Sequence, residues 1–228
     1  MTAAMRRLID LSTPVRTGHF RWQVERRFVK THDSGAGQAT WAGWNVHAFT
    51  HMDSPRHVDP EGFTTDAITL DMTVGPGAVV DVSAVPANSP IERAVLVEAG
   101  AHLRPGDIAL IRARWDERES LDTPGFWLNA PWMTAEGAIW LRERGIKAVG
   151  FDFPQDRCIR FFLTGQPRPP LPEHVTHYHL LRHGIIMFEY LCNMGALKQP
   201  RNEVFALPIR LPDSDGAPAR VIAIEDAA

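Results

Sequence analysis

Two apolar segments constrain the fold of this chain more than any other feature of its sequence. The segments VGPGAVVDVS (74–83) and GDIALIRARW (106–115) are rich in aliphatic, largely β-branched residues and contain glycine at or near their start. Such runs are typical of buried β-strands. The stretch between them, PIERAVLVEAG (90–100), begins with proline and ends with glycine, and we expect it to form a short helix.

The remaining segments extend this pattern into a mixed sheet. Thr134 can cap a helix over 135–144, Gly145 can close it, and IKAVGFDFP (146–154) should follow as a strand. Further strands are expected over LIDLSTPV, WNVHAFTHMD, VFALPIRLP and ARVIAIED, a helix over VTHYHLLRHG and a loop over LTGQPRPPLPEH. Because strands outnumber long helices, we expect an α/β fold with a mixed sheet. A chain of 228 residues predicts a single domain, 1–228.

Composition excludes several classes of function. The formal net charge of −3 and the pI near 6.4 give no electrostatic basis for binding nucleic acid or an anionic membrane, and no segment could span a bilayer. Cys158 and Cys192 lie far apart, which argues against a disulfide framework or a thiolate zinc site and fits a reducing compartment. Nucleotide-binding glycine motifs and a G-x-S-x-G motif are absent from the sequence. We therefore expect a soluble cytoplasmic protein with a small-molecule substrate and no nucleic acid or membrane partner.

A cluster of histidines in HAFTHMDSPRH (47–57) is the strongest indication of chemistry. If the preceding segment forms a strand, His47, Phe49, His51 and Asp53 share one face, because side chains alternate along a strand. Imidazole nitrogens and a carboxylate oxygen suit zinc or manganese, and three protein ligands leave a position open for water. Surface or hydrogen-bonded histidines without metal are the alternative, but the spacing H-x-x-x-H-x-D favours a metal site.

Two further features lie outside this segment. His57 follows Pro55, which interrupts the strand, so its imidazole could shuttle protons beside a metal, or serve as a fourth ligand or a hydrogen-bond partner. Glu189 lies in the apolar run IIMFEYL, where a carboxylate must be exposed, paired or bound to metal. Four histidines precede it, and their spacing alone does not choose among them: His174, His177, His179 and His183.

Together these motifs resemble the cyclase-like metal-dependent hydrolases, the family that includes bacterial kynurenine formamidase and isatin hydrolase. LIDLSTPV is similar to the family's opening DLS-P strand, and HAFTHMDSPRH resembles its signature H-x-G-T-H-x-D-x-P-x-H. GDIALIRARW, TAEGAIWLRERGIKAVGFDFP and H-x-x-L-L-x-x-G-I-x-x-x-E follow in the family's order, so the resemblance covers nearly the whole chain. It implies a mixed sheet that closes towards a barrel, flanked by helices, and a homo-oligomer, either a dimer or a tetramer.

The resemblance also implies a set of metal ligands. His47, His51 and Asp53 would bind a first ion, and Asp53 would bridge to a second. The family's later histidine precedes its glutamate by twelve positions, which selects His177, since 189 − 12 = 177. His177 would bind the second ion and Glu189 would contact both.

Beyond the ligands, the resemblance implies that His57 is the catalytic proton donor and acceptor and that Trp22 stacks on the substrate. Phe49 stands where the signature has glycine, so its ring is expected beside the ligands and against the substrate. The proline-glycine-aspartate that follows the tryptophan in formamidases is absent, and Gln155 replaces the family's serine after D-x-P. Because of these departures, kynurenine formamidase itself is not the activity that we expect first.

The expected activity is hydrolysis of the C–N bond of a small aromatic or cyclic amide by a metal-activated water, with one or two Zn²⁺ or Mn²⁺ ions per subunit. A lactone or ester hydrolase with the same site and a non-catalytic metal-binding protein are the alternatives. An open coordination position beside an intact His57 favours the enzyme, whereas a closed shell of four ligands would favour a structural ion.

Overall fold

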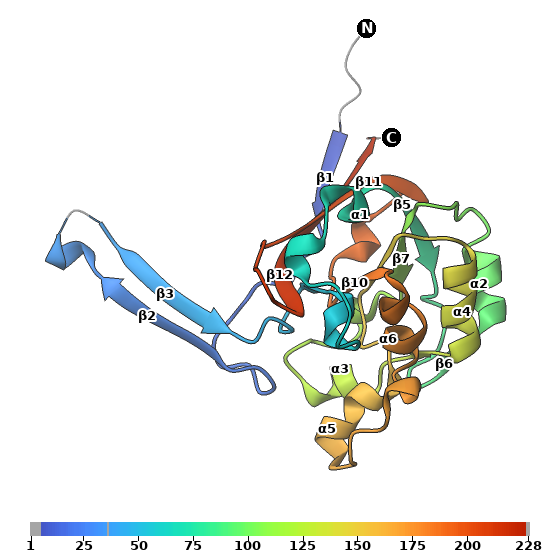
Figure 1. Ribbon diagram of the computed structural model, residues 1–228, viewed down its shortest axis with the longest axis horizontal. Helices are drawn as coiled ribbons and strands as arrows, with labels where there is room; N and C mark the ends of the chain where they lie inside the picture. Colours follow the sequence, from blue (N-terminus) through green and yellow to red (C-terminus); the bar gives the residue numbers. More distant parts are fainter. Residues whose placement is uncertain (1–5, 36, 227–228) are drawn as a thin grey trace, which may run out of the picture.

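The computed structural model describes residues 6–35 and 37–226, and its main feature is a closed mixed sheet (Figure 1). Seven strands form the ring, in the order β12-β11-β5-β7-β9-β10-β4 and back to β12. The strands from β5 to β10 are parallel and the other pairs are antiparallel. The eighth strand, β1, pairs with the last residues of β12. The eight strands are β1 (Arg6–Asp10), β4 (His51–Asp53), β5 (Val74–Asp81), β7 (Ile108–Arg112), β9 (Ala148–Phe151), β10 (Ile186–Glu189), β11 (Arg201–Pro208) and β12 (Gly216–Asp226).

Helices cover one side of this sheet. Helix α4 (Ala135–Glu143) contacts both α2 (Arg93–Ala99) and α6 (Val175–His179), and the three lie on the same side of the molecule (Figure 1). As expected from the sequence, the Thr134 side chain accepts a hydrogen bond from the Gly137 backbone N–H at 3.2 Å and caps α4. The shorter elements are α1 (Leu70–Thr73), α3 (Pro124–Leu128), α5 (Phe161–Thr164), the strand pair β6 (Pro90–Ile91) and β8 (Trp132–Met133), and 3-10 helices over 32–34, 55–57, 65–67, 115–117, 157–160, 171–173, 181–183 and 194–196. The mixed α/β fold with a sheet closed towards a barrel is thereby confirmed.

Alternation along the strands separates two cores. One core joins buried side chains from all seven strands of the ring, among them Met52 on β4 and Phe188 on β10. The other packs alternate strand residues, such as Val80 and Phe151, against the helices. Since Met52 belongs to the first core, period-two alternation directs its neighbours on β4 towards the second. The histidine motif therefore faces the helix-covered side of the sheet.

The strand expected over residues 44–53 is only partly present. β4 comprises His51–Asp53 alone, and residues 45–50 form a turn in which Phe49 adopts a left-handed backbone conformation with φ 59°. The prediction that His47 and Phe49 share a strand face with His51 is therefore wrong. A left-handed residue reverses the local direction of the chain, which period-two alternation does not allow for.

A two-stranded arm projects from the closed sheet (Figure 1). β2 (Val24–Lys30) and β3 (Ala39–Trp44) pair antiparallel with each other and form a separate two-stranded sheet. Phe28 and Val29 are 57% and 65% exposed on this arm, and Trp41 is 41% exposed. A hairpin of two strands is marginally stable without further packing, so these apolar side chains mark the arm as an unusual feature of the surface.

One buried ion pair joins the turn before β7 to β11. Asp107 is 2% exposed and accepts hydrogen bonds from the Arg201 guanidinium at 2.7 and 2.8 Å and from the Arg104 N–H at 2.8 Å. Burial raises the pKa of Asp107, but the pairing with Arg201 outweighs it and holds the pKa below its usual value. Within the described residues, no helix is long and apolar enough to cross a membrane.

Candidate metal centre

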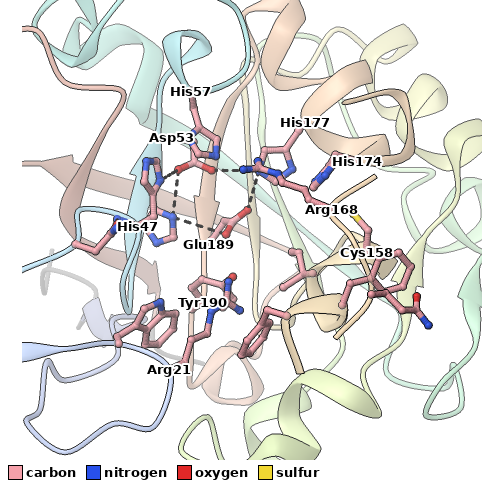
Figure 2. A pocket seen from close by; sticks show the side chains of 17 residues that line it. Arg21, His47, Asp53, His57, Cys158, Arg168, His174, His177, Glu189 and Tyr190 are labelled. Carbon is pink, nitrogen blue, oxygen red and sulfur yellow. Dashed lines mark hydrogen bonds and ion pairs between the residues drawn. The ribbon is translucent and has the colours of Figure 1, made fainter. Parts of the chain in front are cut away.

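Adjacent strands bring the histidine motif next to the later glutamate. β10 pairs antiparallel with β4, and Glu189 lies directly opposite His51 in the register. Asp53, two residues along β4, points to the same side as His51. His51 Nε2 lies 3.1 Å from Asp53 Oδ1 and 3.7 Å from Glu189 Oε2. Figure 2 shows the carboxylates of Asp53 and Glu189 between imidazoles from different parts of the chain.

The orientation of His51 is fixed by the turn that precedes it. Its Nδ1 lies 2.8 Å from the Phe49 carbonyl oxygen, which can only accept, so Nδ1 carries the hydrogen. In a neutral imidazole, Nε2 then bears a lone pair, and this buried atom has no hydrogen-bond partner among the described residues. A lone pair that faces two carboxylates is unfavourable unless a cation lies between them.

His177 on α6 reaches the same carboxylates from the other side. Its Nε2 lies 3.7 Å from Asp53 Oδ2 and 3.5 Å from Glu189 Oε1, and its Nδ1 donates to Asp156 Oδ2 at 2.7 Å. Burial lowers the pKa of His177, but the hydrogen bond to Asp156 and the nearby carboxylates outweigh it and raise the pKa to about 9. A carboxylate behind a histidine in this way is the usual support of a metal-ligating imidazole.

His47 lies in the turn before β4 and contacts two carboxylates. Its Nδ1 is 2.7 Å from Asp53 Oδ1 and its Nε2 is 2.8 Å from Asp215 Oδ2. Burial lowers the pKa of His47, but these two partners outweigh it and raise the pKa to about 9. A Cβ at Gly216 would lie 2.6 Å from His47 Cε1, so only glycine allows β12 to approach this ring.

The strand β4 ends before Pro55, as expected, and His57 lies in the 3-10 helix Pro55–His57 that follows. Its Nδ1 donates to Asp215 Oδ2 at 3.1 Å, and its ring centroid is 4.1 Å from that of His47. Burial lowers the pKa of His57 from 6.5, although Asp53 and Asp215 partly oppose this change. The imidazole therefore favours the neutral form, with Nε2 free to accept a proton.

A cavity of about 480 Å³ opens onto these groups. Trp22 lines it, as do Tyr190 and Phe162. The Trp22 ring packs at 4.8 Å from Phe49 and 5.2 Å from Tyr190, measured between centroids. Phe49 itself is fully buried behind Trp22 and is not among the residues that line the cavity, so its influence on a ligand would act through Trp22.

The structure therefore brings together all five residues expected as ligands, and His57 beside them: His47, His51, Asp53, His177 and Glu189. His174 lines the same cavity, whereas His179 and His183 do not. Sequence reasoning missed the carboxylates that orient the histidines, Asp156 and Asp215. Neither has a signal of its own in the sequence, because each lies in an irregular segment far along the chain from its main partner.

The donor set fits a divalent metal ion. Ligand atoms of His47, His51 and Asp53 lie within 4.8 Å of one another, as do those of Asp53, His57 and His177. Imidazole nitrogens and carboxylate oxygens suit zinc and manganese, and the buried unpaired Nε2 of His51 is the atom that such an ion would satisfy.

This fold and this constellation define a candidate histidine–carboxylate metal centre on a closed α/β sheet. A family model described as putative cyclase matches residues 9–155, which is more than half of the sequence, and the chain belongs to that cyclase family. Kynurenine formamidase of Bacillus thuringiensis (strain Al Hakam) is 26% identical over 221 residues, covering 94% of this chain and 95% of the relative.

Solved structures share the fold. Isatin hydrolase A from Labrenzia aggregata, bound to benzyl benzoate, superposes with a TM-score of 0.78 at 21% identity, covering 97% of this chain and 94% of that one. A structure described as a potential metal-dependent hydrolase with cyclase activity gives 0.71 at 23% identity, covering 98% and 100%. The family resemblance expected from the sequence is confirmed.

Proposed function

We propose that this protein is a metal-dependent hydrolase that cleaves the C–N bond of a small aromatic or cyclic amide. The observation that carries this proposal is the convergence of His51 Nε2 and His177 Nε2 on the carboxylates of Asp53 and Glu189, at the floor of a cavity. The cavity wall supports an aromatic substrate, since it presents the rings of Trp22, Tyr190 and Phe162. The names of its relatives, a kynurenine formamidase and an isatin hydrolase, support the same reaction class.

The proposed ligands are His47, His51, Asp53, His177 and Glu189, for one or two zinc or manganese ions. When bound, such an ion lowers the pKa of water and polarises a carbonyl group. Asp156 holds His177 so that Nε2 points to the ligand cluster, and the Phe49 carbonyl does the same for His51. Figure 2 shows His47, Asp53, His177 and Glu189 grouped together at the pocket, away from Arg21.

His57 is the proposed proton carrier. Hydrolysis breaks the C–N bond, joins the oxygen of water to the acyl carbon and requires a proton on the leaving nitrogen. Asp215 accepts the Nδ1 hydrogen of His57, so Nε2 can take a proton from water and deliver it to the nitrogen. Because burial lowers the pKa of His57, the imidazole is ready to accept at neutral pH.

Assembly and location are also proposals. We propose a homo-oligomer in which the β2–β3 arm packs on a second copy, because the arm exposes Phe28, Val29 and Trp41 and pairs with no other strand of the described chain. The free cysteines Cys158 and Cys192 support a reducing location such as the cytoplasm. The closure of strands from residues 6–226 into one sheet supports a single catalytic domain.

The test combines metal content with a substrate screen. The purified protein should carry zinc or manganese by elemental analysis, and His51→Ala should lose most of it, whereas His183→Ala outside the cavity should not. The screen should compare N-formyl arylamines, isatins and lactones. Wild-type metal content in His51→Ala would show that the ligand assignment is wrong, and cleavage of lactones alone would replace the amide with an ester as the substrate.

A further inference from the structure

One arginine of the cavity, Arg21, packs between aromatic rings and forms no ion pair with any of the described residues. The Arg21 guanidinium carbon lies 4.1 Å from the centre of the Trp127 ring and 4.2 Å from that of Phe162. Packing against aromatic faces fixes the plane of a guanidinium, but it leaves the N–H groups at its edge unsatisfied. Arg21 is therefore oriented before any ligand arrives.

At least one donor of the Arg21 guanidinium has no partner among the described residues. Its Nη1 is buried and has no hydrogen-bond partner among the described residues. None of the ion pairs formed within residues 6–35 and 37–226 includes Arg21. By contrast, the guanidinium of Arg201 donates two hydrogen bonds to the buried carboxylate of Asp107. Since an unpaired buried donor is costly, an anion on a ligand would satisfy Arg21.

Two aromatic rings in contact with each other, Tyr190 and Trp22, connect the ligand cluster to Arg21. The Tyr190 ring is 5.5 Å from the His51 ring and 5.2 Å from the Trp22 ring, and the Arg21 guanidinium is 5.5 Å from Trp22. In the view of Figure 2, Tyr190 lies between Arg21 and Glu189. A planar substrate along Tyr190 and Trp22 could present its amide to the cluster and a second group to Arg21.

We propose that Arg21 recognises a carboxylate on the substrate, so that the substrate class is an aromatic or cyclic amide with an acidic group on the side of the ring opposite the scissile bond. This inference rests on the proposed hydrolase function and specifies its substrate. Arg168 also lines the cavity, but it is exposed to solvent, where an ion pair contributes little. Arg21 is therefore the specificity-determining residue.

Kinetics on matched substrates test the proposal with the metal-loaded protein. 4-Formamidobenzoate and 4-formamidobenzamide differ only in the charge of the distal group, and the wild type should prefer the acid by about 10- to 100-fold in kcat/KM, mainly through KM. Arg21→Gln should abolish this preference, and Arg21→Lys should keep only part of it, because an ammonium lacks the planar fork. Arg118→Gln is the matched control, since Arg118 also packs on a tryptophan, Trp115, but lies outside the cavity.

Binding gives a second readout that does not depend on turnover. Trp22 and Trp127 flank Arg21, so their fluorescence should report binding of benzoate and of its neutral analogue acetophenone. We expect Arg21→Gln to weaken benzoate binding by about tenfold or more and to leave acetophenone unaffected. A thermal unfolding midpoint close to that of the wild type confirms that the variant is folded.

The outcomes separate this inference from the proposed function. Equal hydrolysis of both formamides by the wild type overturns the role of Arg21 and leaves the hydrolase intact. Loss of the preference in Arg168→Gln, with retention in Arg21→Gln, moves the role to Arg168. If neither formamide is cleaved, the proposed formamide hydrolysis fails and the benzoate titration decides the inference, because binding unchanged by Arg21→Gln places the carboxylate elsewhere.

Discussion

Replacement of Asp156 by asparagine should weaken metal binding although every proposed ligand stays in place. Asp156 Oδ2 accepts from His177 Nδ1 at 2.7 Å, and Oδ1 accepts from the Thr176 N–H at 2.8 Å. Asparagine has nearly the same shape, but it has no charge to orient the imidazole. Loss of such a carboxylate typically lowers metal affinity by about 10- to 100-fold, which corresponds to about 1.4–2.7 kcal/mol at 25 °C.

The assay is a competition titration of metal-free protein with zinc or manganese against a fluorescent chelator. Asp107→Asn is the control, because it also removes a buried, hydrogen-bonded carboxylate but lies outside the cavity, and its metal affinity should match the wild type. A wild-type affinity in Asp156→Asn, together with a large loss in His177→Ala, would refute the argument that the carboxylate positions His177. A wild-type affinity in both variants would remove His177 from the ligand set.

The remaining predictions concern catalysis, stability and assembly. His177→Ala should lower metal occupancy far more than His179→Ala, and the reverse order in elemental analysis would contradict the choice between them. His57→Asn should keep its metal but lose roughly 10²–10⁴-fold in kcat, the usual range for a proton carrier, and loss of metal would make it a ligand instead. Asp107→Asn should lower the free energy of unfolding at pH 7 by about 1–3 kcal/mol. Because the pKa of Asp107 is lowered in the folded state, this difference should be present above about pH 4 and disappear as the pH falls through the folded pKa, and a difference constant with pH in denaturant titrations would argue against the ion pair. Phe28→Asp should reduce the mass measured by light scattering to that of the monomer, and an unchanged oligomer would place the interface elsewhere.

Much of the fold could be predicted because its signals are local. The Thr134 cap, the apolar strands β5 and β7, and the glycine at the end of α2 depend only on residues close in sequence. The β2–β3 arm had no such signal, since its exposed strands lack the alternation that a half-buried strand shows. Neither the left-handed Phe49 nor the contact between Gly216 and His47 follows from local pattern, because each depends on how distant segments pack.

The candidate site likewise contains some residues that the sequence could identify and others that only the folded structure reveals. Its ligand residues were selected by spacing and family resemblance, and the structure brings them together. Their supporting groups, Asp156 and Asp215, could not be selected, because the pairs Asp156–His177 and Asp215–His47 form only after the chain has folded. Arg21 was also missed, because only the folded structure shows that its buried Nη1 has no hydrogen-bond partner among the described residues.

The closure of the sheet by β12 has a consequence for the order of events during biosynthesis. β4 carries two proposed ligands and is held between β10 and β12, while β1 pairs Arg6 with Asp226, at the opposite end of the described chain. Pairings of such long sequence separation form slowly, and here they require residues 216–226 to have left the ribosome. A nascent chain that stops before β12 contains every proposed ligand, but β4 then lacks one of its two neighbouring strands. Metal acquisition should therefore follow the synthesis of residues 216–226, which complete the ring of strands around the ligands.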